Sequence, residues 1–265
     1  MNKLEKIISD KREAVSRRMK EKSILRTRSD AEAMPPALDF RASLVNIATE
    51  TRIIAEVKKS SPSADFGGNS LNVVDIAVSY ERAGAAAISV LTEEYYFSGS
   101  MNDLRMIKAS VDIPVLCKDF IIDPFQLYDA RAAGADAILL IAAILDSYEL
   151  PDFISICKTV GITPFVEVTD TSDIDKALNC DINWIGINCR DLKTFELDLK
   201  KIAELLPLIP DDFLVVAESG IKNSEDLNYI NDLGIYAALI GSMFMKSDIP
   251  GRALEMLIGE NHDKS

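Results

Sequence analysis

The chain has 265 residues, of which 48% are hydrophobic and 27% charged, and its formal net charge is −13. This length suits one α/β barrel and leaves no room for a second catalytic domain beside it. A surface with this much negative charge repels phosphodiester backbones, and we therefore expect no nucleic-acid partner. The longest apolar run, at 137–145, is too short to span a membrane, and we expect a cytoplasmic protein.

Residues 1–50 predict a helical extension that precedes the barrel. The first 30 residues hold ten basic and five acidic side chains, which we interpret as a solvated helix face. An apolar stripe at helical spacing predicts that one face packs on the barrel, and it consists of Leu4, Ile7, Ile8 and Val15. A break at Pro35-Pro36 and a short helical pattern at 38–48 follow. We expect some of these helices to lie near the catalytic mouth.

Eight short apolar runs, each ending on a polar or small residue, alternate with helical patterns. They occupy residues 53–58, 86–92, 114–119, 136–141, 163–168, 184–188, 214–219 and 237–242. Successive runs end 20 to 33 residues apart, which is the length of one strand, one helix and two loops. This repeat predicts one α/β domain, a (β/α)8 TIM barrel at 51–258 with the helical extension before it and a polar tail at 259–265.

The helical patterns between the runs carry recognisable end signals. Three of them end on a glycine suited to the left-handed conformation, namely Gly84, Gly134 and Gly234. The side chains expected to cap the helix N-termini are Asp123, Ser172 and Ser224. The segment 248–259 is expected to form the closing helix after the eighth strand.

Polar side chains at the ends of buried strands are costly to desolvate unless they open onto a cleft. Side-chain alternation along the strands predicts which of them face the barrel axis. This inward set consists of Glu56, Lys58, Lys118, Glu167 and Asn188, with Arg190 continuing the alternation beyond the sixth strand. Cys117 and Cys189 then face the helix layer. Because parallel strands end on one face, the set predicts an active site, and a structural ion-pair network at the rim is the alternative.

The usual metal ligands and the usual general base are missing from the predicted barrel. Neither metal-ligand nor C-x-x-C spacing joins the cysteines, and the single histidine, His262, lies in the polar tail. We therefore expect no metal and no cofactor, with acid–base chemistry carried by lysines and glutamates. A second lysine nearby is expected to lower the pKa of a lysine acid, and low polarity to raise the pKa of a glutamate base.

Two glycine-containing loops follow the seventh and eighth strands, at 217–221 and 240–244. Barrels of this kind bind phosphate at these loops through backbone N–H groups. The expected phosphate cradle consists of Gly220 and Gly241, with hydroxyl donors from Ser219 and Ser242, although each Ser and Gly pair alone is more often a simple turn. The segment 58–68 predicts a mobile loop that covers a ligand, or an ordinary surface loop.

In chain order, seven segments resemble the indole-3-glycerol-phosphate synthase family: IAEVKKSSPS, VLTEEYYFSGS, PVLCKDFIIDPFQ, FVEV, IGINCRDLKTF, AESGI and LIGSMFM. The resemblance extends from about residue 39 to residue 245 and includes the N-terminal helices. It implies ring closure of 1-(2-carboxyphenylamino)-1-deoxyribulose 5-phosphate with loss of carbon dioxide and water, in tryptophan biosynthesis. It also implies a lyase that needs no cofactor or metal. We expect a monomer or a weak homo-oligomer.

The resemblance also implies a role for each site residue. Lys118 matches the general acid that polarises the ketone, while Lys58 matches a lysine that binds anionic groups of the substrate and donates a proton in dehydration. Glu167 matches the glutamate of the dehydration steps, with Glu56 in support. The catalytic set is completed by Asn188 and Ser219, which match residues that hold the substrate and the intermediate. The expected substrate-binding residues are Arg190, Ser61 and Glu218, and the expected phosphate-binding residues are Lys58, Gly220, Gly241 and Ser242.

Two departures from the family pattern and two competing functions remain. Cys189 stands where the family more often has asparagine, and YYF at 95–97 varies on a more usual aromatic pair that would contact the anthranilate ring. A phosphoribosylanthranilate isomerase would need a cysteine where Lys58 stands. A catalytically dead phosphate-binding barrel that serves as a scaffold is the alternative from another class of protein.

Overall fold

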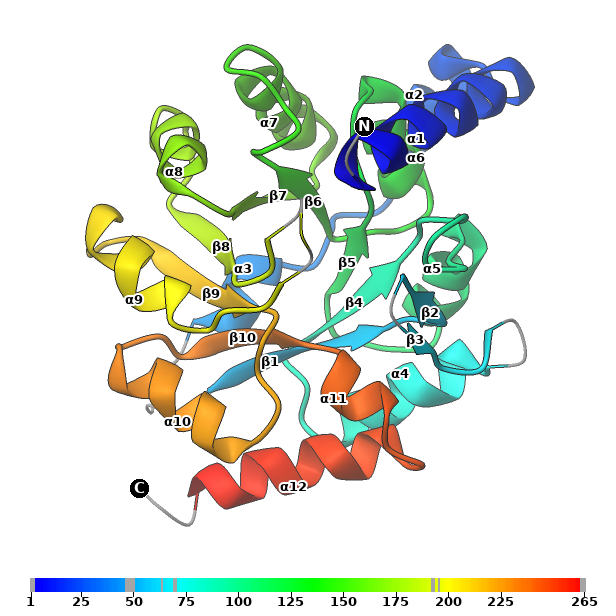
Figure 1. The fold of residues 1–265 in the computed structure, drawn as a ribbon. Helices are drawn as coiled ribbons and strands as arrows, with labels where there is room; N and C mark the ends of the chain where they lie inside the picture. Colours follow the sequence, from blue (N-terminus) through cyan, green and yellow to red (C-terminus); the bar gives the residue numbers. More distant parts are fainter. Residues whose placement is uncertain are drawn as a thin grey trace.

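The computed structural model describes residues 3–45, 51–62, 64–68, 71–191, 194 and 196–262. In this part of the chain, eight parallel strands close into a barrel in the order β1-β10-β9-β8-β7-β6-β5-β4 (Figure 1). The strands are β1 (Arg52–Val57), β4 (Ala87–Leu91), β5 (Val115–Lys118), β6 (Ala137–Ile141), β7 (Thr163–Val168), β8 (Trp184–Asn188), β9 (Leu214–Glu218) and β10 (Ala237–Ile240). Each lies on one predicted apolar run, which confirms the (β/α)8 barrel.

Helices surround the barrel and connect its strands (Figure 1). They are α4 (Val73–Arg82), α5 (Met101–Lys108), α6 (Pro124–Ala132), α7 (Glu149–Val160), α8 (Thr171–Leu178), α9 (Lys201–Leu205) with the 3-10 turn η2 (Leu206–Leu208), α10 (Ser224–Asp232), α11 (Ser242–Met245) and α12 (Pro250–His262). Two short strands, β2 (Ser60–Ser61) and β3 (Ala64–Asp65), form a hairpin in the loop after β1. The helix α12 continues to His262, so the segment expected as a polar tail from 259 is helical over its described part.

The predicted helix ends are right in part. Asp123 accepts a hydrogen bond from the Phe125 N–H and caps α6 as predicted. The predicted caps Ser172 and Ser224 are wrong, because Asp170 and Asn223 cap those helices and the two serines lie inside them. The three predicted glycines all have positive φ angles, of 91° at Gly84, 96° at Gly134 and 83° at Gly234.

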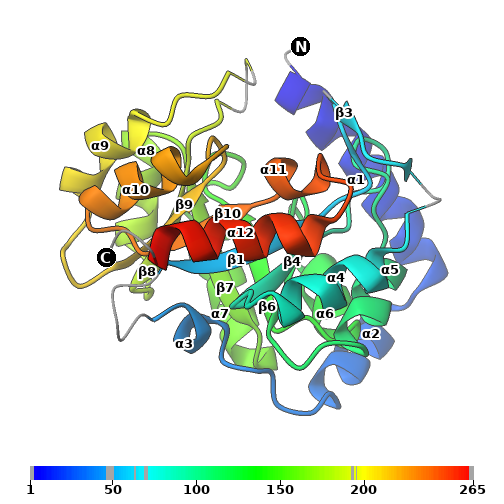
Figure 2. The ribbon, with the colours of Figure 1, turned by 90° about the horizontal axis from the view of Figure 1, so that it is seen from below.

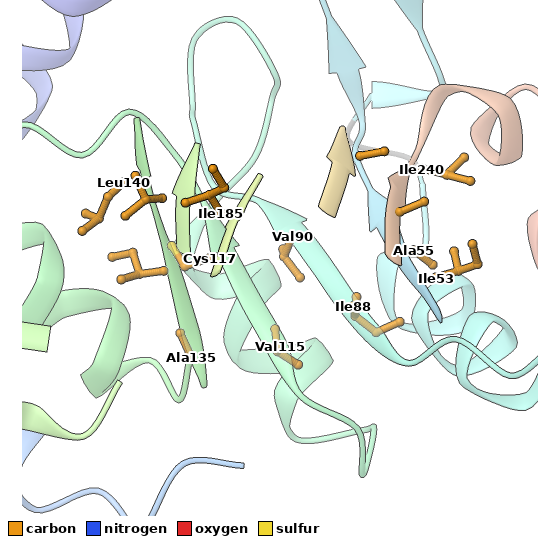
Figure 3. Packing of buried hydrophobic residues seen from close by; sticks show 14 of the residues in the cluster. Ile53, Ala55, Ile88, Val90, Val115, Cys117, Ala135, Leu140, Ile185 and Ile240 are labelled. Carbon is orange, nitrogen blue, oxygen red and sulfur yellow. The ribbon is translucent and has the colours of Figure 1, made fainter. Parts of the chain in front are cut away.

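Side-chain alternation divides the buried apolar residues into two cores. The outer core lies between strands and helices and includes Val90 and Cys117, which are labelled in Figure 3. The inner core fills the barrel and includes Leu116, Phe165 and Leu239. Since neighbouring residues of one strand belong to different cores, the inward side chains at the strand ends converge on a single space above the inner core.

The N-terminal extension covers both ends of the barrel. Its helices are α1 (Lys3–Glu21), α2 (Ile24–Glu32) and α3 (Phe40–Leu44). In Figure 2, α3 lies at the end of the barrel opposite α1 and α11. Phe40 enters the inner core there, with its ring centroid 5.8 Å from that of Trp184. The rest of the helical pattern expected at 38–48, from residue 46, lies outside the described residues.

The predicted apolar stripe of α1 is confirmed by the burial of Ile7 and Val15. The interpretation of its basic residues as a solvated face is wrong for Lys11, whose side chain is 2% exposed and pairs with Asp119. Among the described residues, none of the helices combines the length and hydropathy that a membrane span requires.

Candidate active site

A cavity of about 660 Å³ opens at the carboxyl ends of the barrel strands. Every predicted site residue except Glu218 lines it, so the cavity brings together Glu56, Lys58, Ser61, Lys118, Glu167, Asn188, Arg190, Ser219, Gly220, Gly241 and Ser242. Glu218 is fully buried directly below the cavity floor, where it contacts Lys118. One mouth therefore holds the predicted set, with Glu218 buried beside it.

Lys118 lies at the centre of this set, at the carboxyl end of β5. Its Nζ atom donates to Oε2 of Glu218 at 2.5 Å and lies 3.5 Å from Oε2 of Glu167. The two carboxylates come from β9 and β7, so three strands place these groups. The Lys118 side chain is 15% exposed and both glutamates are buried, but Lys118 and Glu167 line the cavity, so a ligand can reach these two groups of the cluster.

Lys58 forms a second cluster, beside the first. It follows β1, and its Nζ atom donates to Oε1 of Glu56 at 2.7 Å and to the Ser242 hydroxyl at 2.9 Å. The Phe66 ring of the hairpin loop lies over the ammonium group, with its centroid 5.8 Å away. A Cβ atom at Gly241 would come within 2.4 Å of the Glu56 carboxylate, so this glycine makes room for Glu56 as well as exposing backbone.

The expectation that Lys118 has a lowered pKa is wrong. Burial by itself lowers the pKa of this ammonium group, but the carboxylates of Glu218, Glu167 and Glu56 outweigh burial and raise it above 10.5. For Glu56 the balance runs the other way: burial opposes ionisation, yet Lys58 and Lys118 together lower the pKa below 4.5. Without a ligand, Lys118 therefore carries its proton throughout the neutral range.

Glu218 is the glutamate with the raised pKa that sequence reasoning expected of a base. Burial raises the pKa of its carboxyl to about 8 against the opposing attraction of Lys118, with Glu167 adding to the increase. Its Oε1 atom has no hydrogen-bond partner among the described protein atoms. This oxygen lies over Gly186, where a Cβ atom would come within 2.1 Å of it.

We expect Glu218 to make the protein less stable as the pH rises from about 5 to 8. The folded state keeps the proton up to about pH 8, whereas the unfolded chain releases it near 4.5, so raising the pH over this window favours unfolding. The shifts of Lys118 and Glu56 act above 10.5 and below 4.5. Relative to Glu218→Gln, the wild-type free energy of unfolding should fall by roughly 3 kcal/mol in urea titrations over this range. Parallel pH profiles for the two proteins would contradict the raised pKa.

The sixth barrel strand adds an amide and a guanidinium group. The Asn188 Oδ1 atom accepts a hydrogen bond of 2.9 Å from the Arg190 N–H, which fixes the turn at the end of β8. Burial lowers the pKa of the Arg190 guanidinium, while Glu56 opposes that change. Cys189 packs in the outer core as predicted, where burial raises the pKa of its thiol to about 12.

The predicted phosphate cradle has two residues with positive φ angles, and two lysines that the sequence analysis does not predict lie beside it. Ser219 has a φ of 65° and Gly220 one of 91°, so two successive residues adopt the left-handed conformation, which is uncommon for serine. Lys222 and Lys246 also line the cavity. Each follows its glycine by a few residues, and a lysine shortly after a glycine-containing barrel loop is the signal that could have identified them.

An apolar wall lines the opposite part of the cavity and includes Leu91, Phe97, Phe120, Leu139 and Ile141. These residues belong to β4, β6 and the loops that follow β4 and β5, whereas the cradle follows β9 and β10, across the barrel. Sequence reasoning placed the aromatic segment at 95–97 against a ring, and Phe97 is the member of that segment that reaches the cavity. Leu4 of α1 also lines the cavity, which agrees with the expectation that part of the N-terminal extension lies near the catalytic mouth.

The closed barrel and the lysine–glutamate cluster at its carboxyl ends define a (β/α)8-barrel enzyme. The family model described as "Indole-3-glycerol phosphate synthase" matches residues 4–257. The chain belongs to the indole-3-glycerol phosphate synthase family.

Relatives of this name match over nearly their whole length. The chain is 40% identical over 260 residues to the one from Variovorax paradoxus, covering 96% of this chain and 98% of the relative. It is also 40% identical over 266 residues to the one from Trichodesmium erythraeum, covering 98% and 90%.

Solved structures of other enzymes share the fold. The 3-hexulose-6-phosphate synthase of Salmonella typhimurium superposes with a TM-score of 0.62 at 12% identity, covering 80% of this chain and all of that one. A KGPDC from Streptococcus mutans gives a TM-score of 0.59 at 14% identity, covering 80% of this chain and 99% of that one. Identities this low establish a common barrel and nothing about the reaction.

Proposed function

We propose that this cavity converts 1-(2-carboxyphenylamino)-1-deoxyribulose 5-phosphate into indole-3-glycerol phosphate, carbon dioxide and water. The observation that carries the proposal is the protonated Lys118 between Glu167 and Glu218 on the cavity floor. Family membership supports the reaction, and the contacts of each residue support the role that we propose for it.

The two sides of the cavity suit the two ends of this substrate. The apolar wall with Phe97 and Phe120 can receive the carboxyphenyl ring, and burial of an aromatic surface supplies binding energy. The cradle with Gly220, Gly241 and Ser242 faces it across the barrel and can receive the phosphate through backbone N–H groups. The ketone carbon, which lies between these ends, then comes to rest over Lys118.

Lys118 serves as the acid of the ring closure. The ring carbon that bears the carboxylate attacks the ketone carbon, and the Lys118 ammonium group donates a proton to the oxygen as negative charge develops there. The bond to the carboxylate then breaks, carbon dioxide leaves, and its electron pair restores the aromatic ring. The Glu167 and Glu56 carboxylates near Lys118 stabilise the positive charge that the arylamine nitrogen carries in the intermediate.

Dehydration uses the second cluster. Lys58, held by Glu56 and Ser242, donates a proton to the hydroxyl group, which leaves as water. Glu167 removes the proton from the neighbouring carbon, and the electron pair of that bond completes the indole double bond. Asn188 and Arg190, joined through the turn at the end of β8, are available to hold the substrate and its carboxylate.

Turnover of the synthetic substrate, followed by indole fluorescence in the presence of a chelator, tests the proposal directly. Product formation supports both the reaction and its independence of metals. Folded protein without turnover would overturn the synthase proposal and favour the alternative, a catalytically dead phosphate-binding barrel that serves as a scaffold. Lys58 occupies the place where the isomerase of the same pathway would need a cysteine, which disfavours that reaction.

Replacement of Ser242 by glutamate tests the cradle. The new carboxylate would lie near the Lys58 ammonium group, which now donates to the Ser242 hydroxyl, and would repel the phosphate. We expect KM to rise by about tenfold to a hundredfold, with a smaller loss in kcat. Ser242→Ala is the matched control, because it removes the hydroxyl without adding a charge. An unchanged KM in Ser242→Glu would place the phosphate elsewhere.

A further inference from the structure

The N-terminal helix α1 reaches the active site through a buried ion pair. The Nζ atom of Lys11 lies 2.5 Å from Oδ1 of Asp119, and the two side chains are 2% and 3% exposed. Asp119 directly follows Lys118 and lines the cavity. A charge on the extension is thus joined to the end of the strand that presents the proposed acid.

Asp119 also organises the loops around it. Its Oδ1 atom accepts the backbone N–H of Phe120 at 2.7 Å, and its Oδ2 atom accepts the Thr92 hydroxyl at 3.0 Å. Thr92 follows β4, and Phe120 belongs to the apolar wall. The carboxylate that Lys11 neutralises therefore holds the backbone from which the Phe120 ring projects.

A second contact joins α1 to the other aromatic loop. The Tyr96 hydroxyl donates a hydrogen bond to Asp10, the residue next to Lys11 in the helix. The backbone of this loop is held by Glu93, whose carboxylate accepts the N–H groups of Tyr96 and Phe97. Adjacent residues of one helix thus hold the two loops that carry Phe97 and Phe120.

These two rings lie next to each other on the apolar wall. Their centroids are 6.4 Å apart, with an angle of 42° between the ring planes. Leu4 of the same helix also lines the cavity. The separation of the rings sets the shape of the wall. Helix α1 holds the two loops that carry the rings, through the contacts of Lys11 with Asp119 and of Asp10 with Tyr96.

We propose that Lys11 is a positioning residue for recognition of the substrate's aromatic ring. It acts through Asp119 on the Phe97 and Phe120 wall, and this inference rests on the proposed function. The Lys11–Asp119 pair is not needed merely to anchor the helix, because Arg18 of α1 and Lys22 directly after it form ion pairs with Asp129 of α6. A buried ion pair gains little stability over apolar packing, so we assign the Lys11–Asp119 pair the role of fixing one geometry of the wall.

The test compares two ligands in two variants. The ring-bearing ligand is the substrate with its ketone reduced to an alcohol, which cannot react, and the ringless ligand is ribitol 5-phosphate. In Lys11→Met we expect the Kd of the ring-bearing ligand to rise about tenfold and that of ribitol 5-phosphate to stay within about twofold. Lys22→Met is the matched control, because it removes an ion pair that lies away from the cavity. In this control we expect both Kd values to match the wild type.

Equal loss for both ligands in Lys11→Met, or unchanged binding of both, would overturn the inference. Should Lys11→Met fail to fold, the double variant Lys11→Met with Asp119→Asn removes the unpaired buried charge and is measured in its place. Tyr96→Phe removes the hydrogen bond to Asp10 but leaves the one from Arg17 to Tyr95, and it should weaken the ring-bearing ligand selectively, by about threefold. Wild-type protein that binds neither ligand would reject the proposed function instead.

Discussion

Lys118→Met is expected to reduce kcat by about a thousandfold, while the protein stays folded and KM changes little. The loss follows because no other ammonium group lies between Glu167 and Glu218 in the described site. The fold survives because methionine fills the same space and because a buried carboxyl without its cation takes up a proton. Glu218, whose pKa is raised to about 8, already holds a proton at neutral pH and so does not need the cation.

Lys118→Arg is the matched control for this result. It keeps a positive charge between the carboxylates, so its stability should stay close to that of the wild type, but a guanidinium group cannot give up its proton as an acid. We therefore expect its kcat to remain low. Turnover by indole fluorescence and folding by circular dichroism check both variants. Activity of either variant within tenfold of the wild type would contradict the acid role of Lys118.

The barrel fold and the residues that line its cavity could be predicted from the sequence, because each depends on a short-range pattern. Alternation with a period of two assigns Lys118 to the inside and Cys117 to the outside, whatever the helices do. Parallel connectivity then sends every strand end to the same face. The structure confirms the barrel and places Glu56, Lys58 and Glu167 around one cavity, as alternation requires.

The direction of the Lys118 pKa could not be predicted in this way. Alternation gives the face of a strand but neither the height of a side chain in the barrel nor its distance from neighbours on other strands. The sequence pattern indicates the second lysine, whereas the three carboxylates that converge from β1, β7 and β9 determine the direction of the pKa shift. The family resemblance implies substrate binding for Glu218, but its burial beneath Lys118 depends on these side-chain heights, which the sequence does not reveal.

The sequence also fails to reveal two local features that depend on tertiary contacts, namely the partner of Lys11 and the N-cap of α8. Lys11 looked like one more basic residue on a solvated helix, because nothing in its neighbourhood marks Asp119 as its partner, 108 positions away. The cap of α8 is Asp170 and not Ser172, since both residues suit an N-cap and the end of β7 determines where the helix begins.

Gly186→Ala is expected to destabilise the protein by about 3 kcal/mol and to reduce kcat by about a hundredfold. A Cβ atom there would lie 2.1 Å from Oε1 of Glu218 and 2.6 Å from the Phe165 ring. Both neighbours are fully buried and cannot move aside. Since Glu218 also accepts the hydrogen bond from Lys118, displacing it disturbs the proposed acid.

The two effects of Gly186→Ala have a common cause, which a matched control can isolate. Gly259→Ala adds the same methyl group in α12, where it would meet no atom outside its own stretch of helix within 4 Å, and it should be neutral or slightly stabilising. Thermal unfolding and turnover, measured side by side, compare the variants. Loss of stability with normal kcat in Gly186→Ala would mean that the chemistry tolerates a displaced Glu218. Normal stability of Gly186→Ala would mean that Glu218 and Phe165 can move to accept the methyl group, contrary to their close packing.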